Sequence, residues 1–126
     1  MPSAQAERLA RELRVRMIAG HRAAPGMVDY PVLGTAALAL GAYLWASPGL
    51  DRVDDGLVLL ELAQRMGARQ DVPSLRTPDH VAWARTLHGD ARVYEVRDGV
   101  GRLAHDDLPG RVMEILRTGP WTRPTA

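Results

Sequence analysis

Apolar side chains recur at a spacing of three to four residues along most of this chain, and glycine or proline interrupts each run. This spacing predicts amphipathic helices, and the interruptions set their ends. We expect five helices, over residues 4–19, 31–46, 51–66, 78–88 and 108–118. The side chains at three positions can cap helix N-termini: Ser3, Thr77 and Asp107. Glycines stand where three of the helices should stop: Gly20, Gly67 and Gly89.

The second predicted helix, from Pro31 to Ala46, is apolar on every side. It is too short to cross a membrane, which takes roughly 20 apolar residues. A helix of this kind is usually the buried centre of a globular domain. Gly34 and Gly41 are one heptad apart and put small residues on one face, where another helix can approach closely. The short Ser47–Gly49 link predicts an antiparallel hairpin with the third helix.

Residues 91–105 allow two interpretations. Four apolar residues fall at helical spacing, namely Val93, Val96, Val100 and Leu103. However, Gly99 and Gly101 would each cost a helix about 1 kcal/mol. The alternative is a β-hairpin of strands 91–97 and 101–105, because Asp98-Gly99 tolerates the positive φ angles of a tight turn. We favour the hairpin and leave the helix as the alternative.

Composition supports a single, mainly α-helical domain over residues 1–126, with 120–126 as a tail. Apolar residues make up 46% of the chain and charged residues 25%, which is typical of a globular protein. There is no phenylalanine, and leucine and alanine supply much of the apolar content, which favours helices over an extensive sheet.

Charge and cysteine content narrow the classes of function. The net charge of +1 is too balanced for sequence-independent nucleic-acid binding. The absence of cysteine excludes disulfides and thiolate chemistry, and the N-terminal residues lack the apolar run of a signal peptide. We therefore expect a cytoplasmic protein without a membrane segment. Arginine fills every basic position and lysine none, which fits a high-GC bacterial genome.

The histidines predict no metal site. The chain holds His21, His80, His88 and His105, and none is spaced to place two ligands on one helical face. We expect no metal and no cofactor.

The acidic clusters are also better explained by structure than by chemistry. Asp51, Asp54 and Asp55 precede or open one predicted helix, and Asp106 and Asp107 precede another. Carboxylates in a first turn interact favourably with the helix dipole without any functional demand. The two pairs Asp54-Asp55 and Asp106-Asp107 could still form a site if the fold brought them together.

One glycine-rich segment matches a cofactor motif by its letters. Residues 99–104 fit the Gly-x-Gly-x-x-Ala form of the dinucleotide fingerprint, but Pro109 interrupts the long helix that such a site requires. No phosphate-binding loop with lysine and no Gly-x-Ser-x-Gly nucleophile motif occurs. We therefore expect no catalytic residues and no enzyme activity.

Two functions are consistent with these patterns. The helices at 31–46 and 51–66 resemble one unit of the tetratricopeptide-type arrays of bacterial regulators, although the fixed recurrence of such arrays is absent. This resemblance implies protein interaction. We prefer a non-catalytic module that docks a protein partner through its arginine-rich first helix or the edge of the hairpin.

The alternative function is a helical domain that binds a small molecule, or a small enzyme whose site lies outside known motifs. Its candidate residues are Trp83, His88, Tyr94 and the Asp106-Asp107 turn. Tyr43, Trp45 and Trp83 lie at helical spacing in apolar surroundings and are expected to be core residues. Trp121, in the predicted tail, is the exception.

Overall fold

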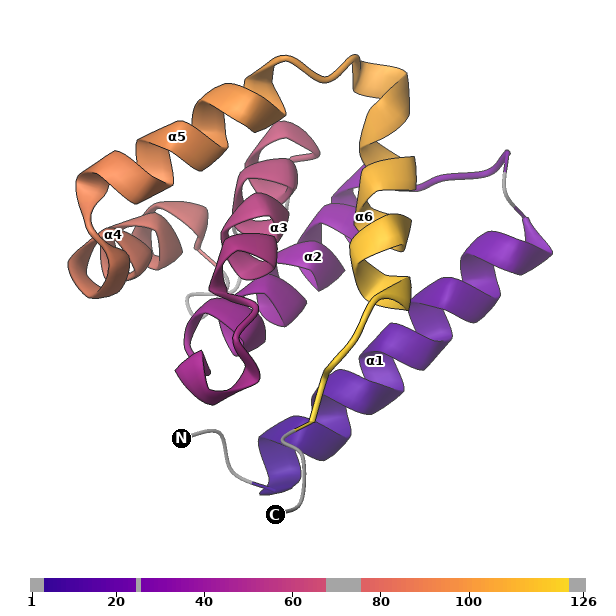
Figure 1. Cartoon of the computed structure of the whole chain (residues 1–126). Helices are drawn as coiled ribbons and strands as arrows, with labels where there is room; N and C mark the ends of the chain where they lie inside the picture. Colours follow the sequence, from indigo (N-terminus) through magenta and orange to yellow (C-terminus); the bar gives the residue numbers. More distant parts are fainter. Residues whose placement is uncertain (1–3, 25, 68–75, 123–126) are drawn as a thin grey trace.

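The computed structural model describes residues 4–24, 26–67 and 76–122, and all regular structure in these ranges is helical (Figure 1). Six α-helices occur there: α1 (Ala4–Ala23), α2 (Tyr30–Trp45), α3 (Val53–Arg65), α4 (Thr77–His88), α5 (Asp90–Gly101) and α6 (Leu108–Arg117). Two short 3₁₀ turns accompany them, η1 (Pro48–Leu50) and η3 (His105–Asp107). The mainly helical class predicted from sequence is confirmed.

The antiparallel pair of α2 and α3 forms the centre of the molecule (Figure 1). Helix α2 begins where the Asp29 carboxylate accepts a hydrogen bond from the Val32 backbone N–H at 3.1 Å. The η1 turn then reverses the chain into α3. The two helices approach closely at Gly41, as the sequence predicts, and the residue opposite is Gly56. Gly34 is also buried.

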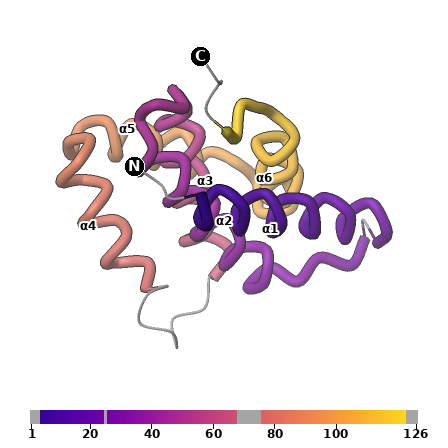
Figure 2. The backbone as a smooth tube through the Cα atoms, turned by 90° about the horizontal axis from the view of Figure 1, so that it is seen from below, coloured from indigo at the N-terminus to yellow at the C-terminus, as the bar shows by residue number. Residues whose placement is uncertain are grey.

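The remaining helices surround this pair. Helix α1 lies across α2 and α6, whereas α4 and α5 pack against α3 (Figures 1 and 2). The core contains the large apolar side chains of both central helices together with those of α6, including Leu38, Trp45, Leu60, Leu108 and Ile115. Among the described residues, no helix combines the length and the apolar character needed to cross a membrane.

The predicted β-hairpin at 91–105 is wrong, because these residues form α5 and the turn that follows it. Val93 and Val100 are buried, and Val96 and Leu103 pack against the core, so the helical spacing of these four residues decides the structure. Gly99 and Gly101 lie in the last turn on the exposed side, where a helix is about to end. No strand occurs within 4–24, 26–67 or 76–122, so there is no hairpin edge in that part of the chain.

The end of α5 is held by a residue from another helix. The Arg65 guanidinium, at the end of α3, donates hydrogen bonds to the backbone carbonyls of Val100 at 2.9 Å and Leu103 at 2.7 Å. The Val100 carbonyl also accepts the Leu103 backbone N–H at 3.1 Å, and Leu103 lies just beyond the helix, so Arg65 adds a charged donor that stabilises this end. The contact spans more than 30 residues of sequence and offsets the poor helix propensity of the glycines.

Several predicted helix boundaries also need correction. Helix α1 continues through Gly20, which is exposed, and ends at Ala23. Helix α3 begins at Val53, two residues after the predicted start, and α4 has Arg76 as its N-cap, so Thr77 is the first helical residue rather than the cap. Asp107 occupies the N-cap position of α6 but makes no capping hydrogen bond with its side chain. Ser3 lies outside the described residues.

Trp121, which the sequence placed in a tail, is 6% exposed and belongs to the core. Its indole Nε1–H donates to the Thr118 carbonyl at 2.6 Å, and its own carbonyl accepts a hydrogen bond from the Tyr43 hydroxyl at 2.8 Å. The guanidinium groups of Arg14 and Arg52 lie 5.1 and 4.8 Å from the centroid of its ring. Cation–π contacts and burial therefore anchor this segment against α1, α2 and α3.

Arg52 is the buried residue that links α3 to the end of α6. It is 5% exposed and donates to the carbonyls of Ile115 at 3.1 Å, Thr118 at 2.6 Å and Pro120 at 3.2 Å. Asp55 accepts hydrogen bonds from the same guanidinium group, the shorter at 3.0 Å. The planar fork of arginine donors is thereby saturated with acceptors, which makes its burial tolerable.

Candidate functional site

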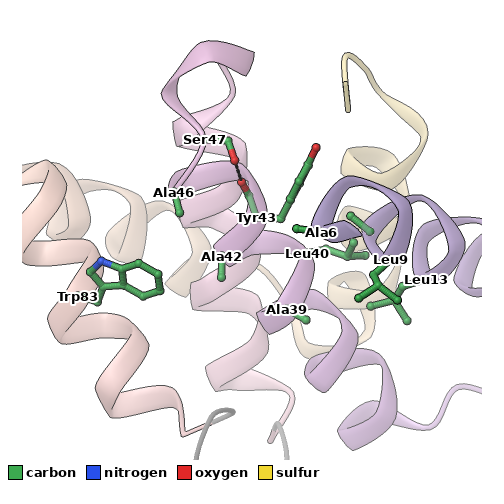
Figure 3. Close-up of a pocket in the computed structure, with 11 residues that line it drawn as sticks. Ala6, Leu9, Leu13, Ala39, Leu40, Ala42, Tyr43, Ala46, Ser47 and Trp83 are labelled. Atoms are coloured by element: carbon green, nitrogen blue, oxygen red, sulfur yellow. Dashed lines mark hydrogen bonds between the residues drawn. The ribbon is translucent and has the colours of Figure 1, made fainter. Parts of the chain in front are cut away.

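An apolar groove follows the outer face of α2, between α1 and α4 (Figure 3). Its floor is formed by the partly buried alanines Ala39, Ala42 and Ala46, which recur at helical spacing along α2. The groove has a volume of about 500 Å³. We call this feature the α2 groove. It was not predicted, because the all-apolar sequence of α2 led us to expect burial on every side.

The rims of the α2 groove carry large apolar side chains. Leu9 of α1 is 57% exposed and Trp83 of α4 is 50% exposed, and Figure 3 shows them on opposite sides of the alanine floor. The Trp83 ring meets the buried Trp45 ring edge to face, with centroids 4.6 Å apart. Because aromatic pairs favour this geometry, Trp45 holds the exposed ring in position.

The chemical character of the α2 groove is uniform. Among the residues that the structure describes, its lining contains no carboxylate, guanidinium or imidazole group. The two hydroxyl groups at one end are already engaged, since Tyr43 donates to the Trp121 carbonyl and Ser47 donates to the Tyr43 carbonyl. The lining therefore provides apolar contact and no group for acid–base or nucleophilic chemistry.

Charge is concentrated on the helix that forms one rim. Helix α1 contains five arginines and two glutamates, whereas α2 contains no charged residue. Arg8, Arg11 and Arg16 are exposed, and the structure gives their side chains no ion pair with any described residue. A positive helix thus borders an uncharged groove.

The histidines do not form a common site. His88 donates through Nε2 to the Trp45 carbonyl at 2.6 Å, and the His80 ring contacts the rings of Trp45 and Trp83. His105 lies elsewhere and stacks on Tyr30 with ring centroids 4.5 Å apart. Within the described ranges, no group of three or more histidine or acidic residues is placed to hold a metal ion.

The two acidic pairs have separate surroundings. Asp54 accepts a hydrogen bond from Arg92 at 2.7 Å, and Asp55 pairs with Arg52 at 3.0 Å. Asp106 and Asp107 are exposed in the η3 turn. The first pair therefore serves to attach α3 to α5 and to the end of α6.

The fold brings together only some of the residues that the sequence suggested for binding a small molecule. Trp83 and His88 both contact Trp45, which places them on one side of α4. Tyr94 lies on α5, where the Arg85 guanidinium is 5.4 Å from its ring centroid. Gly99 and Gly101, from the dinucleotide-like segment, end a helix instead of following a strand and opening one.

A second, polar pocket lies between α3 and the end of α5, and the sequence analysis missed it. Its volume is about 610 Å³, and its lining includes Glu61, Gln64, Arg97 and Arg102. We call it the Glu61 pocket. The sequence contained a signal for this pocket, because Glu61 interrupts the apolar run from Leu57 to Ala63. Glutamate is rarely buried among apolar residues unless it has a partner.

Comparison with known proteins gives no relative: no family model, no curated protein and no solved structure matches the chain.

Proposed function

We propose that this chain is a non-catalytic protein-interaction module that binds an amphipathic helix in the α2 groove. The observation that carries the proposal is the pairing of exposed Leu9 and Trp83 across a floor of alanines. Large apolar side chains that are rigidly held and half exposed are typical of binding surfaces.

The shape of the α2 groove favours a helix as the occupant. Alanine at positions 39, 42 and 46 leaves only methyl groups on the floor, so a helix backbone can approach α2 closely. These residues span about 10 Å along the helix axis, which is nearly two turns. An incoming helix would place apolar residues at i, i+3, i+4 and i+7 between the rims.

The positive charge of α1 favours a partner helix that has acidic residues beside its apolar face. Helix α1 carries five arginines and two glutamates, although no arginine that the structure describes lines the α2 groove itself. Acidic residues on the polar side of the partner complement this net positive charge, which increases the association rate and selects against basic helices. The proposed partner is therefore an amphipathic helix with acidic flanks.

Selection from a displayed library of amphipathic helical peptides tests this proposal. We expect the selected peptides to carry small or apolar residues at helical spacing and acidic residues at the flanks. Leu9→Ser and Trp83→Ala should each weaken the binding of a selected peptide at least about tenfold, because such anchors contribute more than 1 kcal/mol each.

Matched controls distinguish peptide binding in the α2 groove from non-specific binding to exposed apolar side chains. Val15→Ser removes an equally exposed apolar residue of α1, and Tyr94→Ala removes an aromatic residue that is 50% exposed on α5. Neither Val15 nor Tyr94 lines the groove, so peptide binding should be unchanged. Equal losses in controls and groove variants would contradict the proposal. A dimer, seen by light scattering and abolished by Leu9→Ser, would replace the peptide with a second copy of this chain.

A further inference from the structure

The Glu61 pocket contains a buried carboxylate whose hydrogen-bonding capacity is only partly used. Glu61 is 4% exposed, and its Oε1 atom is buried without a hydrogen-bond partner. The Gln64 side chain, one helical turn further along α3, lies close enough to lower the pKa of the Glu61 carboxyl, although its buried Nε2 atom makes no hydrogen bond of normal geometry. Both residues line the pocket.

Such groups are costly in a folded protein. A buried polar atom without a partner carries a desolvation penalty of about 1 to 3 kcal/mol, and a charged one more. Burial raises the pKa of the Glu61 carboxyl above its usual value of 4.5, and Arg97 and Gln64 offset only part of this shift. A ligand that donates to Glu61 would remove the penalty.

The rim of the Glu61 pocket carries positively charged hydrogen-bond donors, in contrast to the carboxylate inside it. Arg97 and Arg102 of the α5 region are exposed, and their side chains form no hydrogen bond or ion pair with the residues that the structure describes. Asp98 lies between them in the sequence. Arg65 also lines the pocket, but its guanidinium is occupied by the Val100 and Leu103 carbonyls. The guanidinium groups of Arg97 and Arg102 are open to solvent at the rim, and carboxylate is the group whose geometry arginine matches best.

We infer that the Glu61 pocket binds a small zwitterion with the chemistry of a free amino acid, its ammonium group on Glu61 and its carboxylate on Gln64, Arg97 and Arg102. A simple cation would satisfy Glu61 and leave the arginines unpaired, and a simple anion would do the reverse. A molecule that carries both an ammonium and a carboxylate group pairs with Glu61 and with the two arginines at once. The described part of the lining holds no aromatic ring on which a nucleobase could stack, which disfavours a nucleotide.

This site is independent of the α2 groove, since the two linings share no residue. Titration calorimetry of the whole chain with individual amino acids, namely glycine, leucine, glutamate and lysine, tests it directly. We expect saturable binding of at least one of them. The deaminated acid and the decarboxylated amine of that amino acid should each bind at least about tenfold more weakly, because each lacks one of the two recognised groups.

Variants assign the binding to these residues. Glu61→Gln should weaken the amino acid at least about tenfold and leave the deaminated acid unaffected, whereas Arg97→Gln should weaken both. Glu95→Gln and Arg117→Gln, at exposed positions outside the Glu61 pocket, are the matched controls and should bind as the wild type does. Circular dichroism verifies that each variant is folded.

Two results would overturn the inference. One is the absence of saturable heat for all four amino acids up to roughly 10 mM. The other is amino-acid binding that Glu61→Gln leaves unchanged, which would place the ligand elsewhere on the molecule.

Discussion

Gly41 of α2 and Gly56 of α3 face each other across a close contact between the backbones of the two central helices. A Cβ atom on Gly41 would lie 2.8 Å from the Gly56 carbonyl oxygen, and one on Gly56 would lie 2.7 Å from the Gly41 carbonyl oxygen. Both distances are far below van der Waals contact, and both involve backbone atoms that cannot rotate away. The absence of side chains at these two residues thus sets the separation of α2 and α3.

Gly41→Leu should therefore destabilise the protein by at least about 1 to 3 kcal/mol, the usual cost of overpacking a core. Urea denaturation measures the loss. Gly110→Leu is the matched control, since Gly110 is an exposed helical glycine and a Cβ atom added to it would have no neighbour within 4 Å. Equal stability of the Gly41 variant and the wild type would show that α2 and α3 are further apart.

Gly99→Ala should raise stability by about 0.5 to 1 kcal/mol, because alanine has the higher helix propensity and Gly99 has open space beside it in α5. The direction of this change discriminates between the two interpretations of residues 91–105. In a hairpin turn Gly99 would need a positive φ angle, and alanine would destabilise it. A lower melting temperature for Gly99→Ala would thus contradict the helix.

Arg52→Ala should lower the free energy of unfolding by about 1.5 to 3 kcal/mol, since the carbonyls of Ile115, Thr118 and Pro120 lose a charged donor. Arg52→Lys should recover only part of this loss, because an ammonium group lacks the planar fork. Arg117→Ala, at an exposed position of α6, is the control. Chemical denaturation of the three variants measures the loss in free energy of unfolding. Equally small losses for Arg52→Ala and Arg117→Ala would contradict the role given to Arg52.

The buried carboxyl of Glu61 should make the difference in free energy of unfolding between the wild type and Glu61→Gln depend on pH. A carboxyl whose pKa is raised in the folded state stabilises that state when protonated, and this contribution is lost as the pH rises through the raised pKa. The wild type should therefore gain stability relative to Glu61→Gln as the pH falls from neutrality towards 4.5. Denaturation of both proteins across this range measures the difference, and a constant difference would contradict the burial of Glu61.

The parts of the fold that follow from sequence are those controlled by local signals. Helices α2 and α4 lie within one residue of their predicted bounds, because proline in the first turn and the glycine or serine that follows act on neighbouring residues. Helix α5 could not be predicted in the same way. The donors that hold its end come from Arg65, which is distant in the sequence.

The candidate sites were less accessible to sequence reasoning. An alanine on an all-apolar helix looks the same whether it faces the core or a groove, so Ala39, Ala42 and Ala46 gave no signal. Trp121 follows the last helix and a Gly-Pro pair, which is typical of a tail. Its burial depends on arginines from α1 and from the start of α3, and no local pattern specifies these contacts.

Arg52 immediately precedes α3 and Arg65 ends it, so both ends of one helix supply donors for the last turns of α5 and α6. Those two helices contain 12 and 10 residues, a length at which isolated helices are marginal in water. Their helicity is therefore coupled to that of α3, and the three helices should fold and unfold as one cooperative unit. A fragment that starts at Thr77 should accordingly be mostly random coil by circular dichroism.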